Sequence, residues 1–101
     1  MRKAIITIVI GLCLTSLVQA QEQRPPREAW NEVFTKRQGR EFPHSHFLAE
    51  TIKRKKPGTA LDIGMGEGRN AIFLAAQGWE VTGFDISDVG VKLAREAAQI
   101  W

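Results

Sequence analysis

Two short apolar runs, separated by a stretch with helical spacing, dominate the hydrophobic pattern of the chain. The first run, 59–63, follows a proline-glycine break and is too short for a helix, so it predicts a buried parallel strand. The second run, 79–86, has the same character. Between them apolar residues recur at helical spacing over 67–77, and Gly78 predicts the end of that helix. The order strand, helix, strand predicts a parallel βαβ unit.

Three further helices are predicted around this unit. Trp30, Val33 and Phe34 recur at helical spacing within 28–37, where Gly39 ends the element, and the aromatic pair serves either packing or the covering of a substrate site. Ser45 can cap a helix that runs to about Lys55, with Phe47, Leu48, Thr51 and Ile52 on one face. Ser87 can cap a last helix from Asp88 to the end, with an apolar side formed by Leu93, Ala94, Ala97, Ala98 and Trp101.

The first 20 residues have the features of a secretory signal peptide. Arg2 and Lys3 precede an apolar run, Ala4 to Val18, and the small residues of the Val18-Gln19-Ala20 triplet fit a cleavage site. We therefore expect a signal peptide over 1–20, a polar linker over 21–27, and a periplasmic or secreted domain over 28–101. The apolar run is shorter than the ~20 residues that span a bilayer, so no stable membrane span is expected once the leader is cleaved. An uncleaved leader that tethers the domain to a membrane is the alternative.

Charge and cysteine content exclude several functions. The formal net charge of +3 comes partly from Arg2 and Lys3 in the leader, and 12 basic against 11 acidic residues remain after it. A net charge of +1 is too balanced to favour a nucleic-acid partner. The single cysteine, Cys13, also lies in the leader, so the mature chain has neither disulfides nor thiolate metal sites.

Two other polar clusters carry little functional signal. His44 and His46 straddle a helix start and point apart with no third ligand evident, so no metal site is expected. The basic run 53–56 sits at a helix C-terminus, where the helix dipole favours cations, and predicts a solvated surface, with a phosphate or nucleic-acid patch as the alternative.

The turn between the first strand and its helix carries most of the chemical information. Gly64, Gly66 and Gly68 follow the pattern GxGxG, which lets a ligand approach the backbone closely at a helix N-terminus. Asp85, near the end of the second strand, can accept hydrogen bonds from the two hydroxyls of a ribose. Asp62 stands two residues before the first glycine. The residues therefore predict an adenosine-type ligand across the ends of two adjacent strands.

Two familiar nucleotide motifs do not fit this turn. A dinucleotide fingerprint needs a third small residue where this chain has Arg69, and the loop lacks the Lys-Ser/Thr pair of a phosphate-binding P-loop. A carboxylate at Asp62 would repel a pyrophosphate but suits a ligand that carries positive charge.

The pattern DxGxGxG with the second acid at Asp85 resembles the cofactor motif of class I S-adenosylmethionine-dependent methyltransferases. LDIGMGEGRNAIFLA followed by GWEVTGFDIS is similar to the small-molecule methyltransferases of the tellurite-resistance type, over about 45–101. The resemblance implies an α/β fold, a partial Rossmann-like doubly wound parallel sheet. The chain would supply the first two strands and flanking helices of a seven-stranded methyltransferase fold, a truncated N-terminal half.

The resemblance also implies a role for each matching residue. Asp62 would face the amino end of the methionine moiety, and Gly64, Gly66 and Gly68 would let the backbone pass under S-adenosyl-L-methionine. Asp85 would hold the ribose hydroxyls, and Ile86 would pack against the adenine ring. Arg69 and Asn70 would brace the helix start rather than touch the ligand.

The function expected from the resemblance is methyl transfer from S-adenosylmethionine to a small-molecule acceptor, with this chain as the cofactor-binding half. In the family the acceptor site lies on later segments, so no catalytic residue is assigned. The alternative is a non-catalytic nucleotide-binding fragment or partner module.

The expected signal peptide predicts that the chain is exported, and a fusion protein can test this. Alkaline phosphatase folds into an active enzyme only on the exported side of the membrane, so a fusion after Gln21 should be active if the leader directs export. A fusion that lacks the leader gives the background activity. Equal activity of the two fusions would contradict export.

Overall fold

The structure is a computed structural model that describes residues 24–99 of the 101-residue chain. The predicted signal peptide and the first part of the predicted linker lie outside these residues. The described part forms, in chain order, four helices and two strands: α2 (Pro26–Arg37), α3 (His46–Ile52), β1 (Thr59–Ile63), α4 (Arg69–Ala76), β2 (Glu80–Phe84) and α5 (Asp88–Ala98).

The two strands pair in parallel, which confirms the α/β class. Their register sets Thr59 opposite Glu80 at one end and Ile63 opposite Phe84 at the other. A parallel pair needs a crossover connection, and α4 provides it. The arrangement is compatible with a partial Rossmann-like fold, whereas the larger seven-stranded sheet stays a prediction.

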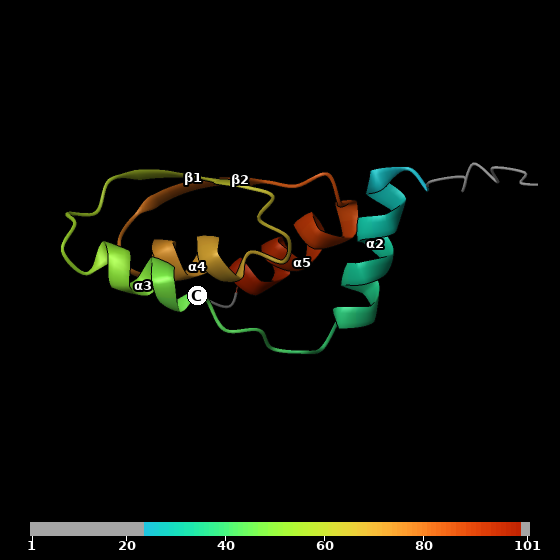
Figure 1. Cartoon of the computed structure of the whole chain (residues 1–101), viewed down its shortest axis with the longest axis horizontal. Coiled ribbons are helices and arrows are strands. Elements are labelled where there is room, and N and C mark those ends of the chain that lie inside the picture. Colours follow the sequence, from blue (N-terminus) through green and yellow to red (C-terminus); the bar gives the residue numbers. More distant parts are fainter. Residues whose placement is uncertain (1–23, 100–101) are drawn as a thin grey trace, which may run out of the picture.

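The sheet is covered on one face. Figure 1 shows both strands as one layer, with α4 and α5 together on the same side. Exposure alternates along each strand, and the bare face presents large apolar side chains, namely Leu61, Ile63, Phe84 and Ile86. The prediction of fully buried strands is therefore wrong for this face within residues 24–99. The crossover helix α4 packs on one face of the sheet, and α5 lies on the same side of it.

Local sequence signals set most helix ends. The Ser45 hydroxyl accepts a hydrogen bond from the Leu48 amide, and the Ser87 hydroxyl accepts one from the Gly90 amide, which confirms both predicted caps. Gly39 and Gly78 follow α2 and α4 with positive φ angles of 80° and 90°, as expected of residues that end helices.

Some boundaries differ from the predictions. α2 begins at Pro26 rather than at residue 28, because proline is favoured in the first turn of a helix. The last two residues of the predicted linker therefore belong to α2. α4 begins at Arg69 rather than at residue 67, because Gly68 is its left-handed cap. α3 ends at Ile52, and its Phe47 is 81% exposed.

α2 stands across the end of the sheet where both strands terminate (Figure 1). Its Phe34 is buried, together with Leu74 of α4 and Ala94 of α5. The Phe34 ring lies against Gly66 and Gly90, so a Cβ atom added at Gly66 would meet the ring at 2.8 Å. Packing is therefore the role that the structure shows for Phe34. No helix within residues 24–99 is both long and apolar enough to cross a bilayer.

Because Phe34 contacts Gly66, substitution of Gly66 should cost more stability than substitution of Gly64. Gly64 and Gly66 have φ angles of 75° and 56°, where an added side chain costs about 1–2 kcal/mol of strain. Only at Gly66 would the new methyl also overlap the Phe34 ring, whereas nothing lies within 4 Å at Gly64. We expect Gly66→Ala to lower the free energy of unfolding by about 2–4 kcal/mol and Gly64→Ala by about 1–2 kcal/mol. Urea unfolding of both variants measures the difference, and equal losses would contradict the packing described here.

Candidate functional site

The turns that follow the two strands lie side by side at the carboxyl edge of the sheet. The amides of Gly64 and Met65 both donate to the carbonyl of Phe84, at 2.9 and 3.0 Å. This pairing carries the ladder of the sheet one step beyond the strands, into the glycine turn. The parallel register thus brings the glycine turn and the Asp85 turn together.

Asp85 joins the two turns through its carboxylate. One oxygen accepts from the Gly66 amide at 2.9 Å, and the other accepts from the Ser87 amide at 2.8 Å. A carboxylate has about four lone-pair sites, so each oxygen can accept one further hydrogen bond. The side chain is therefore fixed in place and still able to accept from a pair of ribose hydroxyls.

Asp62 lies on the half-buried face of β1, opposite Gly83 of β2. Its Oδ2 atom is buried and has no hydrogen-bond partner among the described residues. Burial raises the pKa of this carboxyl, and the negative charge of Asp85 raises it further. The two predicted acids are therefore close enough to repel each other. An uncompensated buried carboxylate oxygen favours a cation or a hydrogen-bond donor as its partner.

A hollow of about 340 Å³ opens where the strands end. It lies between the middle of α2 and the tips of β1 and β2, and its lining includes three of the six predicted cofactor residues, Gly64, Asp85 and Ile86. Its other walls are Trp30, Phe34, Ile63 and Phe84. The backbone at Gly64 is open, because no atom lies within 4 Å of the place that a Cβ would take. A flat ligand could approach the glycine turn from this side.

The other three predicted residues, Asp62, Gly66 and Gly68, do not line this hollow. Asp62 lies on the half-buried face of β1, whereas Ile63 and Phe84 of the hollow lie on the bare face. Gly66 is bonded to Asp85 but covered by Phe34. Gly68 faces the helix layer, where an added Cβ would lie 3.0 Å from the Cβ of Ala94. The geometry gives Gly68 a role in packing α4 against α5.

Arg69 and Asn70 brace the start of α4, as expected. The Arg69 guanidinium donates to the carbonyl of Pro43 at 3.0 Å, and the Asn70 side-chain oxygen accepts from the Ser45 amide at 2.8 Å. Both bonds hold the loop before α3 against the helix, and neither residue lines the hollow.

Two residues of α2, Trp30 and Asn31, contact the site although no sequence pattern marked them clearly. Trp30 lines the hollow, is 49% exposed, and stacks on Phe34 with ring centroids 5.9 Å apart. Its helical spacing indicated an apolar face, which did not separate packing from ligand contact. The side-chain oxygen of Asn31 accepts from the Ser87 hydroxyl at 2.6 Å and from the Val89 amide at 3.3 Å. A lone asparagine in a helix carries no such signal.

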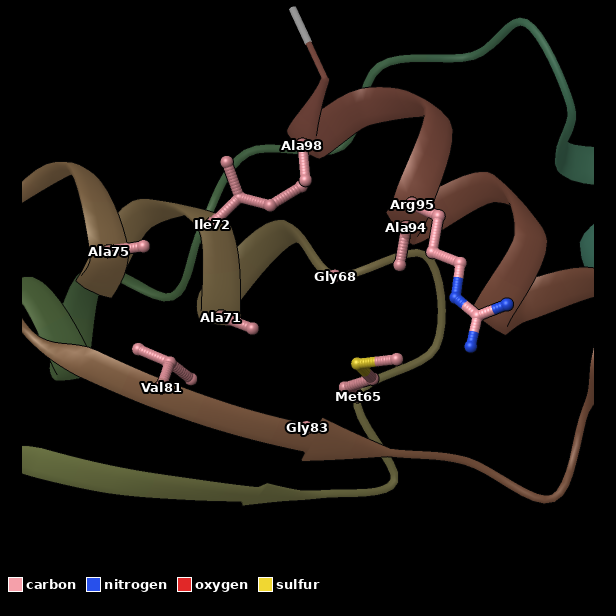
Figure 2. Close-up of a pocket in the computed structure, with 10 residues that line it drawn as sticks. All are labelled: Met65, Gly68, Ala71, Ile72, Ala75, Val81, Gly83, Ala94, Arg95 and Ala98. Carbon is pink, nitrogen blue, oxygen red and sulfur yellow. The ribbon is translucent and has the colours of Figure 1, made fainter. Parts of the chain in front are cut away.

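Other candidate features contribute less. A second hollow of about 220 Å³ lies between α4, α5 and β2, and Figure 2 shows its lining residues, which are apolar or glycine apart from Arg95. Its walls offer a ligand little hydrogen bonding. His44 stacks on Phe73 with ring centroids 3.8 Å apart, whereas His46 lies near Glu50 on α3. Across residues 24–99 no group of three or more potential ligands is placed to hold a metal ion.

The parallel βαβ unit, its side-chain-free turn and the acid at the tip of the second strand are the features of a Rossmann-like nucleotide-binding protein. Comparison with protein families is more specific, since the family described as tellurite resistance protein TehB matches residues 29–100. The chain belongs to this family. The match confirms the resemblance to class I S-adenosylmethionine-dependent methyltransferases of the tellurite-resistance type. A comparison with curated proteins gave no match.

The environment of Asp62 predicts a particular pH dependence of stability. A carboxyl whose pKa is raised by folding favours the protonated form in the folded state. The folded protein should therefore lose stability as pH rises from the ordinary pKa of the carboxyl, 3.8, to its raised value. We expect Asp62→Asn to remove this loss, so the stability of the variant relative to the wild type should rise between acid and neutral pH.

Thermal unfolding of both proteins from pH 3 to 7 measures this difference. Asp88→Asn, which removes an exposed carboxylate on α5, is the matched control for the loss of one charge. If the difference between Asp62→Asn and the wild type were the same at every pH, the account of Asp62 would be wrong.

Proposed function

We propose that this chain binds S-adenosylmethionine in the hollow at the ends of β1 and β2, as part of a methyltransferase that acts on a small molecule. The observation that carries the proposal is the meeting of the open Gly64 backbone, the Asp85 carboxylate and the exposed Ile86 in one hollow. Asp62, whose buried Oδ2 atom has no partner in the described residues and which Asp85 repels, adds a preference for a cationic ligand. A ligand that brings positive charge and N–H donors offsets both costs. S-adenosylmethionine has a sulfonium and an ammonium group, so its charge fits.

The remaining residues support the adenosyl part of the same ligand. The Asp85 oxygens keep free lone pairs for two ribose hydroxyls, and Ile86 offers a 53% exposed apolar side chain beside them. Gly64 leaves its backbone open to the ligand. When bound, the cofactor supplies an electrophilic methyl group, and the residues described here bind and orient it.

The charge of the site argues against a dinucleotide. The pyrophosphate of NAD carries negative charge, which would add to the repulsion between Asp62 and Asp85. The alternative of a non-catalytic nucleotide-binding module shares the cofactor contacts and differs only in lacking methyl transfer. An assay of methyl transfer to small-molecule acceptors therefore separates the two, whereas binding alone does not.

Calorimetry tests the cofactor assignment. We expect the full chain to bind S-adenosylmethionine, and Asp62→Asn to weaken that binding about tenfold through the loss of a negative charge that favours a cationic ligand. NAD should bind at least tenfold more weakly than S-adenosylmethionine. Tight binding of NAD together with no binding of the sulfonium cofactor would defeat the proposal.

A ligand-side control leaves the protein unchanged. Adenosine has both ribose hydroxyls and 2′,3′-dideoxyadenosine has neither, so the wild type should prefer adenosine if Asp85 accepts from them. Equal affinity for the two nucleosides would exclude this role of Asp85.

A further inference from the structure

One face of α2 touches both turns of the proposed site. Asn31, Phe34 and Arg37 follow one another at intervals of three residues, so their side chains lie on the same side of the helix. Asn31 contacts the turn after β2, Phe34 packs on Gly66 of the turn after β1, and Arg37 pairs with an acid of that same turn. Figure 1 shows this helix standing across the ends of the strands.

Asn31 reaches Asp85 through a single intervening residue. Its Oδ1 atom accepts from the Ser87 hydroxyl at 2.6 Å and from the Val89 amide at 3.3 Å. The Ser87 hydroxyl also accepts from the Gly90 amide at 3.0 Å, and the Ser87 amide donates to Asp85. Ser87 is fully buried, so a hydroxyl left without an acceptor there would cost free energy that water cannot restore. Asn31 is thus built into the turn that holds Asp85.

The other two contacts hold the glycine turn from the same helix. The Phe34 ring fills the space above Gly66 and Gly90. The guanidinium of Arg37 donates to the Glu67 carboxylate at 2.8 Å, and it lies 3.8 Å from the centroid of the Phe42 ring. These contacts fix the position of α2, so the Asn31 oxygen is presented to Ser87 at a defined place.

We propose that Asn31 is a positioning residue for Asp85. By holding Ser87, it fixes the Asp85 carboxylate before the cofactor arrives, so the ribose hydroxyls meet an acceptor that is already in place. A preformed acceptor binds more tightly than one that must be ordered during binding. This inference rests on the proposed function, because the group that would bind Asp85 is the ribose of S-adenosylmethionine.

General docking of α2 is the competing explanation, and the chain offers a matched control for it. Arg27, on the same helix, makes a 3.4 Å contact with the exposed Asp88 of α5. This contact joins α2 to α5 but does not pass through Ser87. If docking alone mattered, the loss of Arg27 and the loss of Asn31 would act alike.

The experiment measures the affinity of the full chain for S-adenosylmethionine by calorimetry. Asn31→Leu removes the acceptor at similar size and should weaken binding about tenfold. Asn31→Asp keeps an acceptor oxygen and should stay within about threefold of the wild type, as should Arg27→Gln. In an Asp85→Ala background, Asn31→Leu should cause almost no further loss, because the two residues act in series. If Asn31→Leu does not fold, Asn31→Ala carries the same comparison without added bulk.

Amide hydrogen exchange without cofactor gives an independent measurement. The amides of Gly66 and Ser87 donate to Asp85, so Asn31→Leu should speed their exchange and Arg27→Gln should not. If the wild type does not bind S-adenosylmethionine, the proposed function fails, and this exchange pattern still decides whether Asn31 positions Asp85.

Three results would overturn the inference. The first is a wild type that binds the cofactor while Asn31→Leu binds it equally well. The second is an equal loss of affinity in Arg27→Gln. The third is an unchanged exchange rate at Gly66 and Ser87 in Asn31→Leu.

Discussion

The carboxylate of Asp85 is the interaction on which the rest of the site depends. It accepts one amide from the glycine turn and one from its own turn, so it joins two segments that are 19 residues apart in sequence. A second link joins the two turns, since the carbonyl of Phe84 accepts hydrogen bonds from the amides of Gly64 and Met65. Hydrogen bonds to an ionised acceptor are stronger than bonds to a carbonyl. The residue expected to hold the ligand thus also organises the two turns around it.

Local chemistry in the sequence predicted much of this arrangement. Ser45 and Ser87 were identified as helix caps because their hydroxyls can accept a backbone amide two or three residues ahead, and this needs no knowledge of the rest of the fold. The position of the turn could also be predicted from its glycines, since Gly64 and Gly66 have positive φ angles, which favour glycine. The order of strand, helix and strand then placed the Asp85 turn beside the glycine turn, because carboxyl ends of parallel strands share an edge.

What could not be predicted depends on contacts between distant segments. Spacing showed that one side of α2 is apolar, but not that this side would meet Gly66, and nothing set Asn31 apart from any other polar helix residue. The strands were also misjudged. A run of apolar residues indicates that a strand prefers burial, whereas actual burial depends on which helices fold over each face. In the described residues Ile63 and Phe84 point to the face that α4 and α5 leave bare.

The electrostatics of the site connect these points to function. Among residues 24–99, Asp62 has a buried oxygen without a hydrogen-bond partner, and the charge of Asp85 repels it, so the charged form of Asp62 is disfavoured in the folded state. A core optimised for stability alone would replace Asp62 with an apolar or amide side chain. Its presence is explained if a positively charged ligand compensates the two acids when it binds. The proposed choice of ligand therefore rests more on the two acids than on the glycine turn, because such a turn accommodates many nucleotides.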